Sequence, residues 1–258
     1  MISRVEDTDV IRRGREQVRA GPWQGDSRVA YLVPFCSGPT LSVRFVRWAM
    51  AELGARGFSR VVTSALAPVD QVAFLGAGFE VQERLHLLSH DLETLPAPNV
   101  DAPAGHRRAR ASDHPAVLDL DSRAFPTFWR LDGPGLDDAL AATPRTRFRV
   151  ITLRGDMVAY ALTGRAGRRG FLQRLAVDPE RRRRGLGRAL VLDALRWLRR
   201  RRVERVVVNT PTGNVADLAL YQSLGFRREQ RGLSVLGARL GTVTESRPWA
   251  GGREQANQ

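Results

Sequence analysis

In the second half of the chain, the spacing of apolar residues predicts strands and helices that alternate along the sequence. Residues 185–200 place Leu, Val and Ala three and four positions apart, which predicts an amphipathic helix. The apolar runs 171–177 and 203–209 on either side predict two strands. Residues 216–224 predict a second helix, with Gly225 as its C-terminal cap. The expected order is strand, basic Gly turn, helix, strand, loop, helix.

Shorter elements are predicted upstream of this block from the same periodicities. They are a strand over 107–111, helices over 114–125 and 136–142, and a hairpin of 148–153 with 157–163 around Arg154-Gly155-Asp156.

The distribution of Pro and Ala suggests how the chain is divided. Residues 95–105 are rich in Pro and Ala and carry no periodic pattern, which is typical of a linker. We therefore expect a domain over 1–98, a linker over 99–106 and a second domain over 107–241. The polar end, 242–258, is expected to be a disordered tail.

The two halves also resemble each other at an offset of 145 residues. Residues 45–65 align without gaps on residues 190–210, which suggests an internal repeat. The alternative is a chance match, because the apolar positions of any two helix–strand pairs tend to coincide. The identical pairs are Val46/Val191, Ala49/Ala194, Leu53/Leu198, Arg56/Arg201, Arg60/Arg205, Val61/Val206 and Val62/Val207.

Charge is concentrated in the second half. The formal net charge is +14, and all 41 basic residues are Arg. Residues 1–98 hold 11 Arg and 11 acidic residues, whereas residues 99–258 hold 30 Arg and 16 acidic residues. Such a field favours an anionic ligand, for which nucleic acid and a polyphosphate cofactor are both candidates.

Other residue types exclude several kinds of site. The single cysteine, Cys36, allows no internal disulfide and is expected to be a packed residue rather than a nucleophile. The four histidines show no zinc-ligand spacing. The N-terminus lacks the pattern of a signal peptide, and no apolar run is long enough to span a membrane. A cytoplasmic, metal-free protein is the expectation.

The turn Arg182-Arg183-Arg184-Gly185-Leu186-Gly187 follows a predicted strand and opens a predicted helix. The first amides of a helix have no partner within it, and glycines let the main chain approach a ligand closely. Together with the helix dipole, these features suit an oxyanion or a pyrophosphate. A solvent-exposed basic turn before a capped helix is the alternative interpretation.

This segment resembles the GNAT superfamily of N-acetyltransferases, whose acetyl-CoA loop reads Arg/Gln-x-x-Gly-x-Gly/Ala. Arg182, Gly185 and Gly187 fill that pattern, and Asn214, Leu220-Tyr221 and Gly225-Phe226 match the family's downstream residues. The resemblance covers roughly residues 107–240. It implies an α+β fold with a mixed, splayed central β-sheet flanked by helices, preceded by a partial GNAT-like repeat.

The resemblance also implies roles for individual residues. Tyr221 would be the general acid that protonates the departing CoA thiolate, although a half-buried core tyrosine is the alternative. A strand amide would polarise the thioester carbonyl, and Asn214 would contact the pantetheine arm. The implied acetyl-CoA-binding residues are Leu175, Ala176, Val177, Arg182, Arg183, Arg184, Gly185, Leu186, Gly187, Arg188 and Asn214.

The general base and the acceptor site are not evident in the sequence. Gln173 and Arg174 of the predicted strand are not carboxylates, and Asp132, Asp156 or a water chain could serve as the base. The aromatic segment 124–130 would border the acceptor pocket by analogy with the family, or it would pack in the core.

The corresponding turn in the first half lacks the features of a cofactor site. Residues 182–187 align with 37–42, where Thr40 and Ser42 replace both glycines and Pro39 removes an amide donor. Tyr221 aligns with Phe74 or Leu75. We therefore expect a truncated, degenerate repeat without catalytic activity.

The leading hypothesis is an N-acetyltransferase that transfers acetyl directly from acetyl-CoA to a primary amine in a ternary complex. A catalytically silent module that binds acyl-CoA is the second hypothesis. A nucleic-acid binder is the third, and it is disfavoured because the Arg stripes lack interleaved aromatic residues. The acceptor, either a small molecule or a protein amine, and a homodimeric state stay open.

Overall fold

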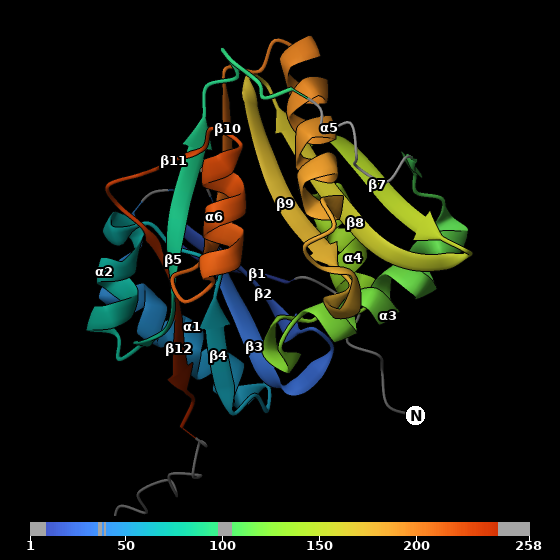
Figure 1. Ribbon diagram of the computed structural model, residues 1–258. Helices are drawn as coiled ribbons and strands as arrows, with labels where there is room; N and C mark the ends of the chain where they lie inside the picture. Colours follow the sequence, from blue (N-terminus) through green and yellow to red (C-terminus); the bar gives the residue numbers. More distant parts are fainter. Residues whose placement is uncertain (1–8, 36–37, 39, 98–104, 242–258) are drawn as a thin grey trace, which may run out of the picture. The chain divides into compact units, whose positions relative to one another are not determined.

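The computed structural model describes residues 9–35, 38, 40–97 and 105–241. Cys36, Pro39, most of the predicted linker and the predicted tail lie outside the described residues. The helices and strands are shown in Figure 1. Their bounds are β1 (Asp9–Arg13), β2 (Glu16–Trp23), β3 (Asp26–Pro34), α1 (Val43–Ala55), β4 (Arg60–Thr63), α2 (Pro68–Gly76), β5 (Glu80–His90), β6 (His106–Arg108), α3 (His114–Ala124), α4 (Gly133–Ala141), β7 (Arg145–Leu153), β8 (Asp156–Ala166), β9 (Arg169–Val177), α5 (Leu186–Arg200), β10 (Arg205–Pro211), α6 (Val215–Ser223), β11 (Arg227–Arg228) and β12 (Leu233–Arg239).

The chain forms two compact units whose segments interleave along the sequence. Unit 1 contains Met1–Ser64, Val72–Glu80 and Gly237–Gln258, and unit 2 contains Ala65–Gln71 and Val81–Leu236. The domain boundaries predicted from composition stay predictions.

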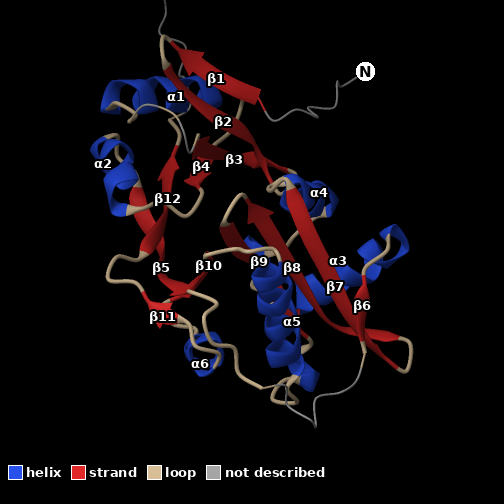
Figure 2. Ribbon diagram, turned by 90° about the horizontal axis from the view of Figure 1, so that it is seen from above, coloured by secondary structure: helices blue, strands red, loops and turns tan. Residues whose placement is uncertain are grey.

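Unit 2 contains a mixed sheet in the order β5-β10-β9-β8-β7-β6. Strands β9 and β10 are parallel, and every other neighbouring pair in this order is antiparallel. One apolar cluster joins α5 and α6 to β10, and another joins α3 and α4 to β7 and β8. The helices therefore flank the sheet, as the predicted fold class requires (Figures 1 and 2).

Most predicted elements of unit 2 are confirmed, with differences at their ends. The strand expected over 107–111 is shorter, because Ala111–Asp113 forms a 3₁₀ turn before α3. Helix α4 begins at Gly133, three residues before the predicted start, because the Asp132 carboxylate accepts the Gly135 N–H at 2.8 Å and Pro134 suits the first helical turn.

Unit 1 has the order β1-β2-β3-β4, followed by the end of β12. Strands β3 and β4 are parallel and are joined through α1, just as β9 and β10 are joined through α5. Helix α1 buries Phe45, Val46, Ala49 and Leu53. This shared connectivity supports the repeat inferred from sequence. Whether the first half is a degenerate GNAT repeat stays a prediction.

The two halves of the chain exchange strands. Strand β5 follows the helices of the first half but pairs antiparallel with β10, with His90 opposite Val206. Strand β12 follows the helices of the second half but pairs antiparallel with β4, with Gly237 opposite Val62. Each half therefore covers a strand edge of the other.

Helix α6 is fixed at its C-terminal end by a histidine on the exchanged strand. His90 is 3% exposed, and its Nε2–H donates to the Leu224 carbonyl at 3.0 Å. Its Nδ1 accepts the Leu92 N–H at 2.8 Å, so the ring is neutral in this arrangement. Burial lowers the pKa of His90, although the hydrogen bond to Leu224 and the charge of Asp91 oppose this effect, and Arg227 adds to it.

We predict that the halves do not fold separately. Expressed alone, fragments 1–105 and 106–258 should lack cooperative thermal unfolding by circular dichroism, because each leaves a strand edge unpaired. Co-expression should give a folded complex of both fragments. A cooperative transition in fragment 106–258 by itself would contradict the role given to the exchange.

We also predict a stability dependence on pH that arises from His90. Between its lowered pKa in the folded protein and about 6.5, the unfolded state binds a proton that the folded state does not. The free energy of unfolding should therefore fall with decreasing pH by up to about 1.4 kcal/mol per unit from this group. Urea titrations from pH 7.5 to 5 should show a shallower dependence in His90→Gln. Parallel profiles would refute this assignment.

Candidate active site

The turn between β9 and α5 presents unpaired main-chain amides. Arg182 has φ −60°, Arg183 has φ +62° and Gly185 has φ +78°. The Ala189 N–H donates to the Gly185 carbonyl at 2.9 Å, so the amides before Ala189 at the start of α5 have no acceptor within the helix. A turn with such φ values followed by a helix N-terminus forms a concave group of N–H donors that suits an anion.

The two glycines of the turn serve different purposes. A Cβ at Gly185 would meet no heavy atom within 4 Å, so this position borders open space and its positive φ favours glycine. A Cβ at Gly187 would lie 3.3 Å from Leu220 Cδ2 and 3.6 Å from Val177 Cγ2. Gly187 therefore allows α5 to pack closely against α6 and β9.

Arginines surround these amides. Arg183 and Arg184 are exposed, and within the described residues neither forms an ion pair. Arg182 donates to the Ala124 carbonyl at 3.4 Å, and Arg188 donates to Ser223 Oγ at 3.3 Å. Uncompensated guanidinium groups beside unpaired amides can bind phosphate oxygens.

Strands β9 and β10 separate beside this turn. They pair only from Arg205 opposite Arg169 to Val207 opposite Phe171. The Asp178 N–H donates to the Val158 carbonyl of β8 at 2.9 Å, so by alternation the N–H groups of Leu175 and Val177 point away from β8. The space left between β9 and β10 is called the wedge below, and these two amides border it.

Buried polar atoms without partners lie on both strands of the wedge. Within the described residues, Gln173 Oε1 and Thr210 Oγ1 are buried and lack a hydrogen bond. Gln173 is the extra residue of a β-bulge, and Thr210 lies beyond the last β9–β10 pair. The Gln173 amide lies over β8, because a Cβ at Gly164 would be 2.9 Å from Gln173 Nε2. Thr210 is therefore the residue of this pair whose unpaired oxygen fits a polar, amide-bearing arm such as pantetheine beside β10.

Tyr221 is buried on α6, and its ring contacts Phe226 edge-on with centroids 5.6 Å apart. Among the described residues, no group hydrogen-bonds to its hydroxyl. Burial, and secondarily the Asp217 carboxylate, raises the pKa of Tyr221. The phenol therefore keeps its proton at neutral pH, as a general acid must. Tyr221 also packs in the core, which was the alternative role considered from the sequence.

Asn214 has a local role that the sequence interpretation missed. Its Oδ1 accepts the Asp217 N–H at 3.1 Å, and its Nδ2 donates to Asp217 Oδ2 at 2.8 Å. Asn214 thus caps the helix that carries Tyr221, and the Asn-x-x-Asp spacing was the available signal. Burial raises the pKa of Asp217, and Arg182 and Asn214 oppose this effect.

Arg174 turns from β9 toward α3 and forms a buried network. Its guanidinium donates to both oxygens of Asp121 at 2.8 Å and to the Trp129 carbonyl at 2.5 Å. It also lies 3.6 Å from the Phe125 ring centroid. Asp121 is fully buried and additionally accepts the Tyr160 hydroxyl. The segment 124–130 is therefore anchored to β9, and sequence analysis did not identify Asp121.

Asp132 and Asp156, the two carboxylates named as candidate bases, lie at the start of a helix and of a strand. Asp132 caps α4, as described above. Asp156 begins β8 in the tight hairpin turn, opposite Leu153, and is exposed. Neither position adds support for a catalytic role.

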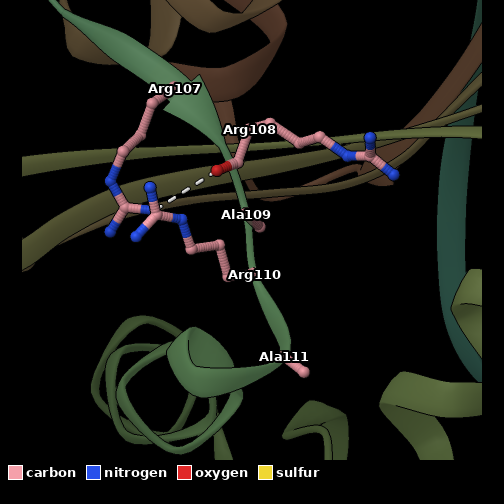
Figure 3. Close-up of a pocket in the computed structure, with 5 residues that line it drawn as sticks. All are labelled: Arg107, Arg108, Ala109, Arg110 and Ala111. Atoms are coloured by element: carbon pink, nitrogen blue, oxygen red, sulfur yellow. Dashed lines mark hydrogen bonds between the residues drawn. The ribbon is translucent and has the colours of Figure 1, made fainter.

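A hollow of about 490 Å³ borders β6 (Figure 3). Arg107 and Arg110 extend on one side of the strand and Arg108 on the other. The guanidinium of Arg107 donates to both oxygens of Asp113 at 2.7 and 2.8 Å and lowers the pKa of Asp113 to about 2. The pair fastens the strand to the turn before α3.

In the first half, side chains of the protein already pair with the amides at the start of α1, the helix that corresponds to α5. Glu16 Oε1 accepts the Ser42 N–H at 2.5 Å, and Ser42 Oγ accepts the Phe45 N–H at 3.1 Å. A carboxylate and a hydroxyl thus occupy the anion position that is open at α5.

The described residues contain no cluster of three or more His, Cys, Asp or Glu side chains arranged for a metal ion. Within the same residues, no helix has the length and apolar character needed to cross a membrane.

The sequence is similar to those of known acetyltransferases. The sequence profile of the Acetyltransferase (GNAT) family matches residues 114–226. The [Ribosomal protein bS18]-alanine N-acetyltransferase of Escherichia coli strain K12 is 32% identical over 117 residues, which cover 45% of this chain and 75% of that protein. Mycothiol acetyltransferase of Amycolatopsis mediterranei is 29% identical over 201 residues, covering 70% of this chain and 66% of that protein.

A solved structure has a similar fold over most of the chain. The tandem GNAT protein from the clavulanic acid biosynthesis pathway superposes with a TM-score of 0.66 at 14% identity, covering 90% of this chain and 82% of that one. The predicted family, fold class and enzyme class are confirmed: the chain belongs to the GNAT family of N-acetyltransferases.

Proposed function

We propose that the protein transfers an acetyl group from acetyl-CoA directly to a primary amine, with both substrates bound at once. The observation that carries this proposal is the conjunction of unpaired amides at the start of α5 with the adjoining wedge between β9 and β10. The amides suit a polyphosphate and the wedge suits an amide-bearing arm, and CoA contains both of these chemical parts.

The donor would bind as follows. The amides of residues 183–188 hold the pyrophosphate, with Arg182, Arg183 and Arg184 around it. The main chain of Leu175 and Val177 hydrogen-bonds the pantetheine arm in the way that an added strand would. Asn214 contributes through the cap of α6, and a direct contact with the arm is compatible with its position at the helix start.

The reaction would proceed by attack of the neutral amine on the thioester carbonyl. A wedge amide of β9 stabilises the negative charge that develops on the carbonyl oxygen. The C–S bond breaks, and the CoA thiolate takes the proton of the Tyr221 hydroxyl. The amine nitrogen loses one proton to solvent, and Tyr221 recovers a proton from the same source.

The catalytic residues would belong to the second half alone. We propose that the first half, residues 1–98, lacks a donor site, because Glu16 and Ser42 already pair with the start of α1. Its strand β5 nevertheless supplies His90 to the end of α6. Its contribution would therefore be structural.

We predict that Tyr221→Phe lowers kcat by roughly 10²- to 10⁴-fold with little change in KM for acetyl-CoA. The substitution keeps the ring that packs against Phe226 and removes only the acidic proton. Thiol release from acetyl-CoA in the presence of an amine library measures the effect, with Tyr31→Phe as the matched control. Unchanged turnover in Tyr221→Phe would contradict the general-acid role, and absence of turnover in the unaltered protein would favour a silent binding module.

We also predict that Gly185→Asp abolishes CoA binding. A side chain there projects into the open space beside the amides, brings a negative charge and strains a residue at φ +78°. Gly155→Asp is the matched control, because Gly155 has φ +94° and open surroundings in the β7–β8 turn. Calorimetry with CoA should show binding only in the control. Equal affinity in both variants would remove the turn from the donor site.

A further inference from the structure

A second cavity lies where β9 and β10 are still paired. It has a volume of about 290 Å³ and is lined by Arg169, Gly170, Phe171, Arg205 and Val207. It combines two guanidinium groups, an aromatic ring and an aliphatic side chain. We call it the junction pocket, because it sits at the narrow end of the wedge.

The junction pocket opens on the sheet face opposite α5 and α6. A Cβ at Gly170 would lie 2.7 Å from Leu198 of α5, and Val206 packs in the cluster formed with α5 and α6. Side chains alternate along a strand, so Arg169 and Phe171 of β9 point to the other face. Arg205 and Val207 of β10 do the same.

The charges of the pocket are incompletely compensated. Arg169 and Arg205 are directly opposite each other across the two strands, an arrangement that destabilises a sheet unless an anion intervenes. Arg205 pairs with Glu229 at 2.5 Å, and Glu229 also accepts the Ser89 hydroxyl. Within the described residues, Arg169 forms no ion pair. One net positive charge therefore remains beside the Phe171 ring.

The location relates the pocket to the reacting group. In the proposed donor pose, the pyrophosphate lies at the start of α5, past the end of β9, so the arm attached to it would run back along β9 from Val177 toward Phe171. The thioester then lies in the wedge near Leu175. Phe171 is four residues from Leu175, a span of roughly 13 Å along an extended strand. The pocket is thus beyond the thioester, on the face away from the helices that hold the donor.

We propose that the junction pocket binds the anionic end of the acyl acceptor, a carboxylate or a phosphate attached to an apolar group. Guanidinium groups bind such oxyanions by paired hydrogen bonds, and Phe171 contacts the apolar part. The acceptor amine then extends from the pocket to the thioester. This inference rests on the proposed function and specifies its acceptor as an anionic amine.

The pocket can be tested without turnover. Calorimetry at low ionic strength on the full chain should detect binding of phenyl phosphate and phenylacetate, and no binding of benzyl alcohol. Arg169→Gln should weaken binding of the anions at least tenfold. Arg168→Gln is the matched control, because Arg168 is the neighbouring residue, is 73% exposed and pairs with Glu204 outside the pocket. Absence of anion binding in the unaltered protein, or equal losses in the two variants, overturns the proposal.

Turnover of matched acceptors separates this proposal from the proposed function. The acceptors must span the roughly 13 Å between the thioester and the pocket. Ala-Ala-Ala-Phe and its C-terminal amide differ only in the anionic group, and 8-aminooctyl phosphate compared with 8-aminooctanol tests phosphate in the same way. Arg169→Gln should raise KM at least tenfold for the anionic member of the preferred pair. The KM for its neutral twin and for acetyl-CoA should not change. If turnover does not depend on the anionic group, the proposed role of the pocket is overturned and the proposed function stands. If the pocket binds anions but no thiol is released from acetyl-CoA, the proposed function is overturned and anion binding by the pocket stands.

Discussion

Main-chain amides without partners at the start of α5 are the constraint on which the rest of the site depends. They exist because β9 ends in a turn with Gly185 at φ +78°, after which the helix leaves its first N–H groups free. Gly187 keeps α6 and β9 close to these amides. Tyr221 lies on the same helix, α6, one residue after the Leu220 that packs beside Gly187. In the proposed mechanism, donor binding and proton donation would thus both depend on one tight turn.

Some arginines of the second half are paired with carboxylates, whereas others have no described ion pair. Arg174 is neutralised by Asp121, and Arg147 donates to both oxygens of Asp193 at 2.7 and 2.8 Å. Burial by itself would raise the pKa of Asp193, but Arg147 holds it below its usual value. In contrast, Arg183 and Arg184 at the turn, and Arg169 at the junction pocket, lack a described carboxylate partner. Arg183, Arg184 and Arg169 are thus among the arginines without a described ion pair, and they lie at the two ends of the wedge.

Local features of this fold could be read from sequence, whereas long-range ones could not. Gly185 and the apolar stripe that follows it predict the start and face of α5, because a helix depends on residues three and four apart. Exchange of β5 and β12 depends on pairings between distant segments, such as His90 with Val206. The Asp121–Arg174 pair joins residues on α3 and β9 that no local pattern relates. Asn214 was assigned to the donor because the family motif contains it, although its cap of α6 follows from Asp217 three residues later.

The central claim is that the first amides of α5 hold the pyrophosphate of CoA, and amide NMR spectra measure this contact directly. Titration of labelled protein with CoA should shift the N–H signals of Leu186, Gly187 and Arg188 downfield, as expected when an amide donates to a phosphate oxygen. Pantetheine, which lacks the pyrophosphate, should leave those three signals in place. If CoA binds while these signals stay unchanged, or if pantetheine shifts them equally, the account of the donor site is contradicted.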